Sequence, residues 1–358
     1  MLALYLFVPP LFFYLRLPWL FAGGAAIAAF SYAIRPAFIK LEKKWGILMP
    51  VVKLLPTCKD YLWGGDRLMK EYNKAFSGER LAETWELSCH PDGPSFIASG
   101  PDAGMTLSAY IEKHGRRILG ANCQIFQEFP IIAKFIDARD DLSIQVHPNN
   151  MDAMEKEHQY GKSEMWYVLE ADPGAYLYYG FTHPITKEEY RRRIEENTLE
   201  EVLNAVPVKK GDLFYIPAGT VHAICKGIVI AEIQQNSNVT YRVYDHGRVG
   251  PDGKPRQLHI DKAVEVSKLE LPCARYNFGG HLVRSAYFTV DRFDAPCQID
   301  TDEESFTSIL VLDGAGSISC GDDVLQCKKG DSLFITASSG MSYLSGNLQV
   351  LCTRIGTI

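Results

Sequence analysis

The sequence predicts a mostly β protein built from two jelly-roll barrels with a small helical insertion. The main observation is an internal repeat, in which KKGDLFYIPA at residues 209–218 recurs as KKGDSLFITA at residues 328–337. Gly-Asp followed by an apolar strand and a turn of small residues is typical of a jelly roll, a fold that protects its strand edges. Strand-like apolar runs fill most of the remaining sequence, so we expect the fold unit to be duplicated.

Length and charge limit the classes of protein to which the chain can belong. Its 358 residues exceed the usual size of a single core, so we divide it into an apolar extension (1–48), a first barrel domain with the insertion (49–270) and a second barrel domain (271–358). The net charge of -6 argues against a nucleic-acid partner, because phosphate binding requires clustered Lys and Arg. The nine cysteines are odd in number and lack CxxC spacing, which favours reduced thiols and a cytoplasmic protein.

The first 48 residues differ from the rest, because they are apolar and poor in acidic side chains. Residues 17–34 are uncharged, and as a helix they would extend about 27 Å, just enough to cross a membrane core. One interpretation is therefore a membrane anchor that holds the rest of the chain in the cytoplasm. The other is that natural translation begins at Met49 and that the preceding residues are upstream sequence.

The individual elements follow from periodicity and capping signals. Thr106 precedes an amphipathic pattern that predicts a helix over 107–119. Thr186, three residues before Glu189, has the pattern of a capping box, and helical periodicity continues to about residue 205, which defines the insertion. Apolar runs predict strands at residues 131–135, 142–147, 164–169, 213–216, 228–234 and 239–244.

Four side chains at predicted strand ends have the pattern of a metal site. Gln145 and His147 are two residues apart in a strand, so they project from the same face. A turn follows at Pro148, and Glu164 begins the next strand. A metal that must also bind substrate needs several fixed ligands, and His222, in PAGTVH, is the candidate for the fourth. One amide, one carboxylate and two imidazoles suit zinc, although manganese, iron or cobalt would also be accepted.

The second copy of the repeat lacks these ligands. Where the first copy continues to His222, the second contains Ser338, Ser339, Gly340 and Met341. Near the position that corresponds to Glu164, the second copy has the run 307–309, Thr-Ser-Ile. We therefore expect a metal-free second barrel and one metal ion per chain.

Four motifs, IQVHPNN, GKSEMWYVL, GDLFYIPAGTVHAI and EIQQNSNVTYRVYDHGR, together resemble the type I mannose-6-phosphate isomerases of the cupin superfamily, in their short bacterial form. The resemblance covers about residues 49–358, so the extension departs from the family pattern. It implies a zinc-dependent aldose-ketose isomerase that interconverts mannose 6-phosphate and fructose 6-phosphate through an enediol or enediolate. It also implies zinc ligation by Gln145, His147, Glu164 and His222.

Further residues match charged active-site positions of this family. Lys162 and Glu232 are the candidates for the general base that removes the proton beside the sugar carbonyl, and the sequence does not distinguish them. The buried setting of Glu232 requires a partner, for which the metal ion is one candidate. Arg242 offers a fork of donors to enediolate or phosphate oxygens, or it forms a structural ion pair. Three weaker candidates for substrate contacts are Ser143, Lys254 and Arg256.

Two other functions fit a cupin fold. A non-catalytic sugar-binding protein would need a metal or a pocket but no base beside it, and an iron oxygenase typically has an open three-ligand site. Lys162, Glu232 and Arg242 favour the isomerase over the first alternative, and the amide-bearing ligand set favours it over the second. A sugar phosphate is the expected substrate, and the oligomeric state is left open.

Overall fold

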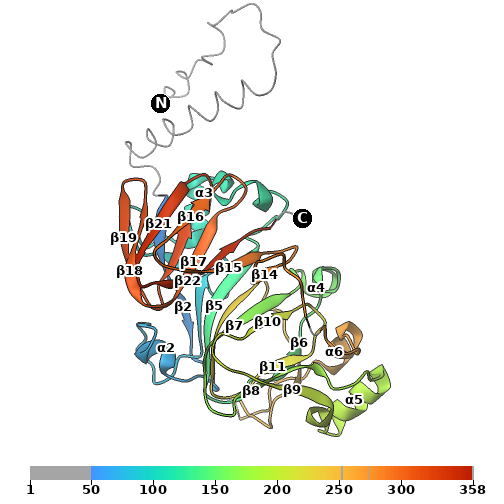
Figure 1. Ribbon diagram of the computed structural model, residues 1–358. Helices are drawn as coiled ribbons and strands as arrows, with labels where there is room; N and C mark the ends of the chain where they lie inside the picture. Colours follow the sequence, from blue (N-terminus) through green and yellow to red (C-terminus); the bar gives the residue numbers. More distant parts are fainter. Residues whose placement is uncertain (1–49, 251–252, 274, 357–358) are drawn as a thin grey trace, which may run out of the picture. The chain divides into compact units, whose positions relative to one another are not determined.

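The computed structural model describes residues 50–250, 253–273 and 275–356, and within them it confirms the predicted pair of jelly-roll barrels. In Figure 1 the strands after residue 290, coloured orange to red, form a group separate from the green and yellow strands of the first barrel. The predicted span 17–34 and the rest of the extension 1–48 lie outside the described residues. No helix in the described part of the chain has the length and apolar character needed to cross a membrane.

The first barrel consists of two antiparallel sheets that face one another. The six-stranded sheet has the order β10-β7-β12-β5-β3-β2, with β2 (Thr57–Lys59), β3 (Glu83–Leu87), β5 (Ile131–Ala138), β7 (Glu164–Ala171), β10 (Leu213–Ile216) and β12 (Ile228–Gln235). The five-stranded sheet has the order β13-β6-β11-β8-β9, with β6 (Ile144–Val146), β8 (Tyr176–Phe181), β9 (Leu203–Pro207), β11 (His222–Ile224) and β13 (Tyr241–Tyr244). Buried side chains from both sheets, including Trp166, Leu177 and Ile230, form the core of this barrel.

The predicted helices form, but each ends earlier than expected. Thr106 caps α3 (Leu107–His114) by accepting a hydrogen bond from Ala109 N at 3.2 Å. The left-handed backbone of Gly115 (φ 81°) then ends the α-helix, and η2 (Arg116–Leu119) continues as a 3-10 turn. Residues 107–119 are therefore two short elements rather than one helix.

The insertion is also shorter than predicted. Thr186 caps α5 (Lys187–Glu195) through Glu189 N at 3.1 Å, as the capping pattern indicates. The helix ends near Asn197, which has a left-handed backbone (φ 55°), and η4 (Leu199–Val202) leads into β9 at Leu203. The expectation of helix up to residue 205 was wrong at its end, because residues 203–205 pair with β8. Together with α6 (Ile260–Val266), α5 covers the outer face of the five-stranded sheet (Figure 1).

Three helices were not predicted: α2 (Arg67–Lys70), α4 (Asn150–Glu157) and α6. Of these, α4 begins directly after the predicted turn at Pro148, and the side chain of Asn149 caps it by accepting a hydrogen bond from Asp152 N at 3.0 Å. The turn thus leads into a helix before the chain returns to β7.

The second barrel includes a strand from the amino-terminal side of the described chain. Its seven-stranded sheet has the order β14-β15-β22-β17-β20-β1-β4, with β1 (Val51–Leu55), β4 (Phe96–Ile97), β14 (Val283–Arg284), β15 (Thr289–Asp294), β17 (Thr307–Asp313), β20 (Ser332–Ile335) and β22 (Gln349–Arg354). Its four-stranded sheet has the order β16-β21-β18-β19, with β16 (Cys297–Thr301), β18 (Ala315–Cys320), β19 (Asp323–Lys328) and β21 (Gly340–Gly346). β1 pairs with β20, Val51 opposite Ile335. The sequence division at residues 270 and 271 stays a prediction.

The two Gly-Asp turns of the repeat adopt the same structure. Gly211 and Gly330 both have left-handed backbones, with φ of 89° and 90°. In the first turn the carboxylate of Asp212 accepts a hydrogen bond from Lys209 N at 2.9 Å, and in the second Asp331 accepts one from Lys328 N at 2.9 Å. Glycine is needed because an L side chain would be strained at this φ. The sequence repeat is therefore a repeat of local structure as well.

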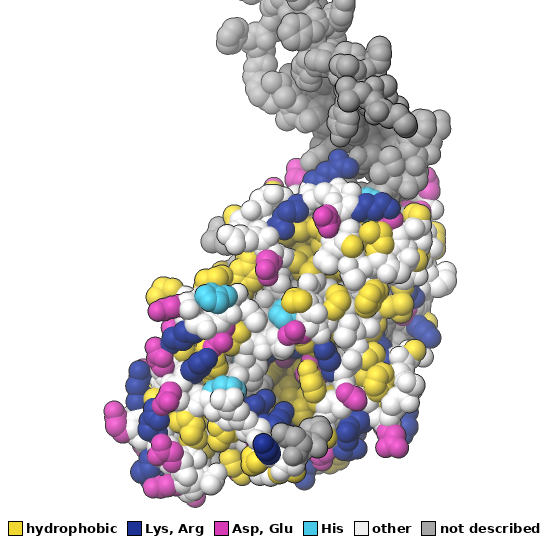
Figure 2. Space-filling model, turned by 180° about the vertical axis from the view of Figure 1, so that it is seen from behind, with side chains coloured by type: hydrophobic (Ala, Val, Ile, Leu, Met, Phe, Trp, Pro, Cys, Tyr) yellow, Lys and Arg dark blue, Asp and Glu magenta, His cyan; other side chains and the backbone are white. Residues whose placement is uncertain are grey.

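The described surface carries charges of both signs. Figure 2 shows Lys and Arg side chains interspersed with Asp and Glu side chains over the face that it draws. The nine cysteines all lie in described residues, and all are free thiols.

Candidate metal and substrate site

The first barrel brings three of the four predicted ligands together at its strand ends. His147 follows β6, Glu164 is the first residue of β7, and His222 is the first residue of β11. One donor atom from each lies within 4.8 Å of the others, and all three side chains are buried. The fourth, Gln145, is paired with His222 across β6 and β11, so the two side chains leave the sheet on the same face. Gln145 lines the adjoining pocket.

Hydrogen bonds to backbone carbonyls orient both imidazoles. His147 Nδ1 lies 2.8 Å from Val239 O, and His222 Nδ1 lies 2.8 Å from Thr220 O. A carbonyl oxygen can only accept, so each Nδ1 carries the proton and each Nε2 keeps its lone pair. The Nε2 atoms lie 3.6 Å and 3.2 Å from the two oxygens of Glu164. Two imidazole lone pairs and a carboxylate thus converge on one point, as a divalent metal requires.

Unpaired polar atoms at this point support the same interpretation. Within the described residues, Glu164 Oε1 and His222 Nε2 are buried without a hydrogen bond of acceptable geometry, whereas Glu164 Oε2 forms an ion pair with Lys162. Buried polar atoms in folded proteins almost always have a partner, because an unsatisfied one costs about 1–3 kcal/mol. The donor set therefore fits a metal ion, and its assignment as the ligand set stays a prediction.

Lys162 lies beside the cluster and shapes its electrostatics. Its Nζ is 2.7 Å from Glu164 Oε2 and 3.1 Å from His147 Nε2. Burial opposes ionisation of Glu164, but the charges of Lys162 and the histidines outweigh it and hold the pKa of Glu164 well below its usual range. Burial, reinforced by Lys162, lowers the pKa of His147 well below the usual value. The carboxylate is thus ionised and the imidazole neutral, which are the states that ligate metals.

A pocket of about 310 Å³ opens next to these ligands and contains most of the other predicted residues. Of the candidates from the sequence, the pocket is lined by Ser143, Gln145, Lys162, Glu232, Arg242 and Arg256. Lys254 is not among the described lining residues. Lining residues that were not predicted include Tyr61, Trp63, Glu83, Lys134, Asn238 and Thr240.

Glu232 has a partner that sequence reasoning missed. Its Oε1 lies 3.2 Å from Lys134 Nζ, and its Oε2 accepts a hydrogen bond from Trp166 Nε1 at 2.9 Å. Lys134 also lies 3.5 Å from Glu83 Oε2 and 4.7 Å from the ring centre of Trp85. The partner expected for Glu232 was the metal ion, whereas the described contacts provide a buried lysine. A single lysine in the apolar run of 131–136 was the signal that pointed to it.

The charges near Lys134 determine its ionisation. Burial alone would lower the pKa of Lys134, but the carboxylates of Glu83 and Glu232 outweigh burial and raise it. The floor of the pocket thus holds an ammonium group between two carboxylates, all three largely excluded from water.

The two arginines of the pocket differ in their partners. Arg242 Nη1 donates to Gln257 O at 3.1 Å, and its Nε is buried without a partner in the described part of the chain. Burial, and then the nearby Arg256, lower the pKa of Arg242. Arg256 instead forms a two-pronged pair with the carboxylate of Asp245, with its Nε 2.7 Å from Oδ2. Arg242 therefore lines the pocket without a carboxylate partner among the described contacts, whereas a carboxylate already neutralises Arg256.

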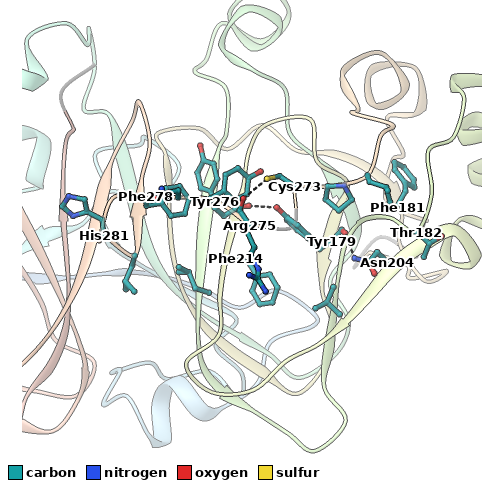
Figure 3. Close-up of a pocket in the computed structure, with 17 residues that line it drawn as sticks. Tyr179, Phe181, Thr182, Asn204, Phe214, Cys273, Arg275, Tyr276, Phe278 and His281 are labelled. Atoms are coloured by element: carbon teal, nitrogen blue, oxygen red, sulfur yellow. Dashed lines mark hydrogen bonds between the residues drawn. The ribbon is translucent and has the colours of Figure 1, made fainter.

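A larger cavity of about 980 Å³ lies elsewhere on the first barrel, between β9, β10 and residues 271–282 (Figure 3). Its wall is aromatic: the rings of Tyr276 and Phe278 stack at 5.5 Å, and the hydroxyl of Tyr179 donates to Tyr215 O at 2.8 Å. None of the predicted site residues lines it. Among its described lining residues this cavity has no carboxylate and no lysine, whereas the smaller pocket has both and lies next to the cluster of His147, Glu164 and His222, so we place the chemistry in the smaller one.

The second barrel contains no equivalent metal cluster among the residues that the structure describes. Thr307 pairs with Ile335 just as Glu164 pairs with Ile216 in the first barrel, so Thr307 takes the place of the carboxylate. The hydroxyl of Thr307 forms a hydrogen bond of 2.9 Å with Thr301. The polar group at this position is thus satisfied within the barrel.

Comparisons with known proteins identify the family of the chain. The family model of the catalytic domain of phosphomannose isomerase type I matches residues 51–202, and the model of the cupin domain of mannose-6-phosphate isomerase matches residues 280–355. A mannose-6-phosphate isomerase of Streptococcus mutans is 36% identical over 302 residues, which cover 82% of this chain and 94% of that protein.

Solved structures give the same result. The crystal structure of mannose 6-phosphate isomerase from Bacillus subtilis matches with a TM-score of 0.78 and 33% identity, covering 85% of this chain and 99% of that one. A structure of mannose 6-phosphate isomerase bound with zinc and yttrium shares the fold, with a TM-score of 0.68 and 20% identity over 86% of this chain and all of that one.

Proposed function

The chain belongs to the type I phosphomannose isomerase family and is an isomerase of mannose 6-phosphate, and on this premise we propose how it works. The reaction interconverts mannose 6-phosphate and fructose 6-phosphate through an enediol or enediolate, with one zinc ion per chain. The observation that carries this proposal is the convergence of His147, Glu164 and His222 beside Lys162, which lines a pocket together with Gln145 and Glu232.

Gln145, His147, Glu164 and His222 would hold the zinc. When bound, zinc supplies Lewis-acid polarisation of the oxygens on C1 and C2 of the sugar. The chain's own contribution is preorganisation: both Nδ1 atoms are already committed to backbone carbonyls, and the carboxylate is already ionised. We choose zinc because a mannose 6-phosphate isomerase of the same fold has been solved with zinc and yttrium bound.

Lys162 and Glu232, which both line the pocket, are the two candidates for the general base that would take and return the proton between the two sugar carbons. Lys134 supplies the countercharge that the buried carboxylate of Glu232 requires. Arg242 lines the pocket, where its guanidinium would stabilise the developing enediolate or the phosphate. Ser143, Lys254 and Arg256 remain weaker candidates for substrate contacts.

A coupled assay with mannose 6-phosphate, with and without a metal chelator, tests the proposal. We expect turnover that the chelator abolishes and zinc restores. His222→Ala or Glu164→Ala should remove bound metal and activity together, because each supplies a buried donor. An active variant of either that retains its full metal content would overturn the ligand assignment. A chain that binds the sugar phosphate without turnover would instead be the non-catalytic sugar-binding protein.

We propose a cytoplasmic location for the catalytic part, since its nine cysteines are free thiols. The alternative, a membrane anchor through residues 17–34, rests on sequence alone.

A further inference from the structure

Three separate segments carry the proposed ligands. Ser163, the residue before Glu164, forms hydrogen bonds with two other parts of the barrel. Ser163 N donates to Gln235 Oε1 at 2.9 Å, and Ser163 O accepts from Gln235 N at 3.1 Å. The Ser163 hydroxyl accepts a hydrogen bond from Ala218 N at 3.1 Å, in the segment that leads to His222. The backbone just before Glu164 is thus attached both to the end of β12 and to the loop before β11.

The amide of Gln235 connects this attachment to the segment that follows His147. Gln235 Nε2 donates to Asn150 Oδ1 at 2.9 Å, and Asn150 Oδ1 also accepts from Gly161 N at 2.9 Å. Between them, Lys162 N donates to Pro148 O at 3.1 Å. The three successive amides of residues 161–163 therefore all have fixed partners.

The backbone at Gly161 also packs closely against the backbone of Asn149 and Asn150. A Cβ added to Gly161 would lie 2.4 Å from the carbonyl carbon of Asn149, a distance that side-chain carbons do not reach. The backbones of the two ligand segments thus pass one another at a separation that only glycine permits. A shift of residues 161–163 would carry Lys162 and Glu164 with it, because their side chains leave the same short stretch.

We propose that Gln235 is a positioning residue that, through Ser163 and Asn150, sets the placement of Lys162 and Glu164 at the metal site. This inference rests on the proposed function. Gln235 is 3% exposed and uses both ends of its amide, one as acceptor and one as donor. A neutral amide performs this task beside a cation site without adding a charge that would compete for the ion.

The experiment compares Gln235→Met, which keeps the length of the side chain but removes both bonds, with Asn150→Ala, at an exposed position where folding is not at risk. Three quantities are measured: hydrogen exchange of the amides of 161–163 in the metal-free protein, the zinc dissociation constant against a chromogenic chelator, and kcat and KM for mannose 6-phosphate. Tyr287→Phe is the control for Asn150→Ala, since it removes only the 3.4 Å contact of Asn150 with the Tyr287 hydroxyl.

We expect Gln235→Met to speed hydrogen exchange of the amides of 161–163. It should also weaken zinc binding about 10- to 100-fold and lower kcat by a similar factor, because this is the usual effect of losing a residue that orients metal ligands. KM should change less than about threefold, because Gln235 is not among the residues that line the pocket. The double variant should cost no more than the larger single one, because the two residues act as a unit.

Wild-type zinc affinity and kcat for Gln235→Met and Asn150→Ala would overturn the inference. So would an increase in exchange spread evenly over the barrel, since that would indicate a general loss of stability. Failure of the proposed function looks different: the wild-type chain itself would not bind zinc or turn over substrate, while the exchange measurement on the metal-free protein would still report whether Gln235 holds residues 161–163.

Discussion

The buried lysine at the floor of the pocket permits a quantitative prediction. In Lys134→Met the side chain keeps nearly the same volume but loses its charge. The carboxylates of Glu83 and Glu232, now 3.5 Å and 3.2 Å from the ammonium group, would then share a buried site without a cation. Trp85 and Trp166 would still donate one hydrogen bond each to these carboxylates.

The magnitude follows from the distances. At an effective dielectric constant of about 20, each contact of Lys134 contributes roughly 5 kcal/mol of Coulomb attraction, and desolvation of the ammonium group offsets much of the sum. Removal of one partner from a buried ion pair typically costs about 3–5 kcal/mol, and we expect a loss in this range at pH 8. The pKa of Lys134 is raised, so its stabilising contribution is fully present at neutral pH and is lost only as the pH rises past its alkaline pKa.

Urea denaturation of the metal-free protein at pH 8 and pH 5 provides the assay. The loss in Lys134→Met should shrink at pH 5, because protonation of a carboxylate relieves the uncompensated charge. Adding Glu232→Gln should restore part of the stability at pH 8, since it removes one of the two charges. A loss below about 1 kcal/mol at pH 8, or an equal loss at both pH values, would refute the reasoning, because a pure packing defect does not depend on pH.

Three further predictions concern other positions. Burial raises the pKa of Asp137 from its usual 3.8 to about 6, so its destabilising effect grows as the pH rises through this window. In the same urea assay Asp137→Asn should gain about 2.4 kcal/mol over wild type between pH 4 and pH 7.5, and a difference that does not vary with pH would contradict this. Arg242→Ala should keep its zinc but lower kcat about 10²- to 10³-fold, and loss of zinc would assign the arginine a structural role. Metal analysis should give one zinc per chain, unchanged in Met341→Ala, and two would contradict a ligand-free second barrel.

Local patterns predicted much of the fold, because they depend on short stretches of sequence. The repeat identified the two barrels, and the strands that carry Gln145 and Glu164 could be placed from apolar runs bounded by turns. The short strand β11, which begins at His222, was not predicted. The limits of the helices were less predictable, since Gly115 and Asn197 end them through left-handed backbones that amphipathic periodicity does not reveal.

Contacts between residues that are far apart in the sequence could not be predicted. Lys134 was missed because a lone lysine in an apolar strand can lie either at the solvent-exposed edge of a sheet or in a buried ion pair. Only the strand register, which places Lys134 opposite Glu232, distinguishes the two cases. The role of Gln235 was hidden for the same reason, as its amide contacts residues more than 70 positions away. Arg256 was a candidate for substrate contacts. Its ion pair with Asp245 could not be predicted, because it depends on how the turn between the two residues folds back and not on the residue types.

The placement of β1 in the second barrel has a consequence for how the chain is made. Val51 to Leu55 leave the ribosome among the first described residues, yet their partner strand, β20, emerges some 280 residues later. Until β20 has been synthesised, the backbone groups on one edge of this apolar strand are unpaired and can form non-native hydrogen bonds with other strands. The second barrel therefore cannot close before the whole chain has been synthesised, and a fragment that begins after β1 would leave the edge of β20 unfilled.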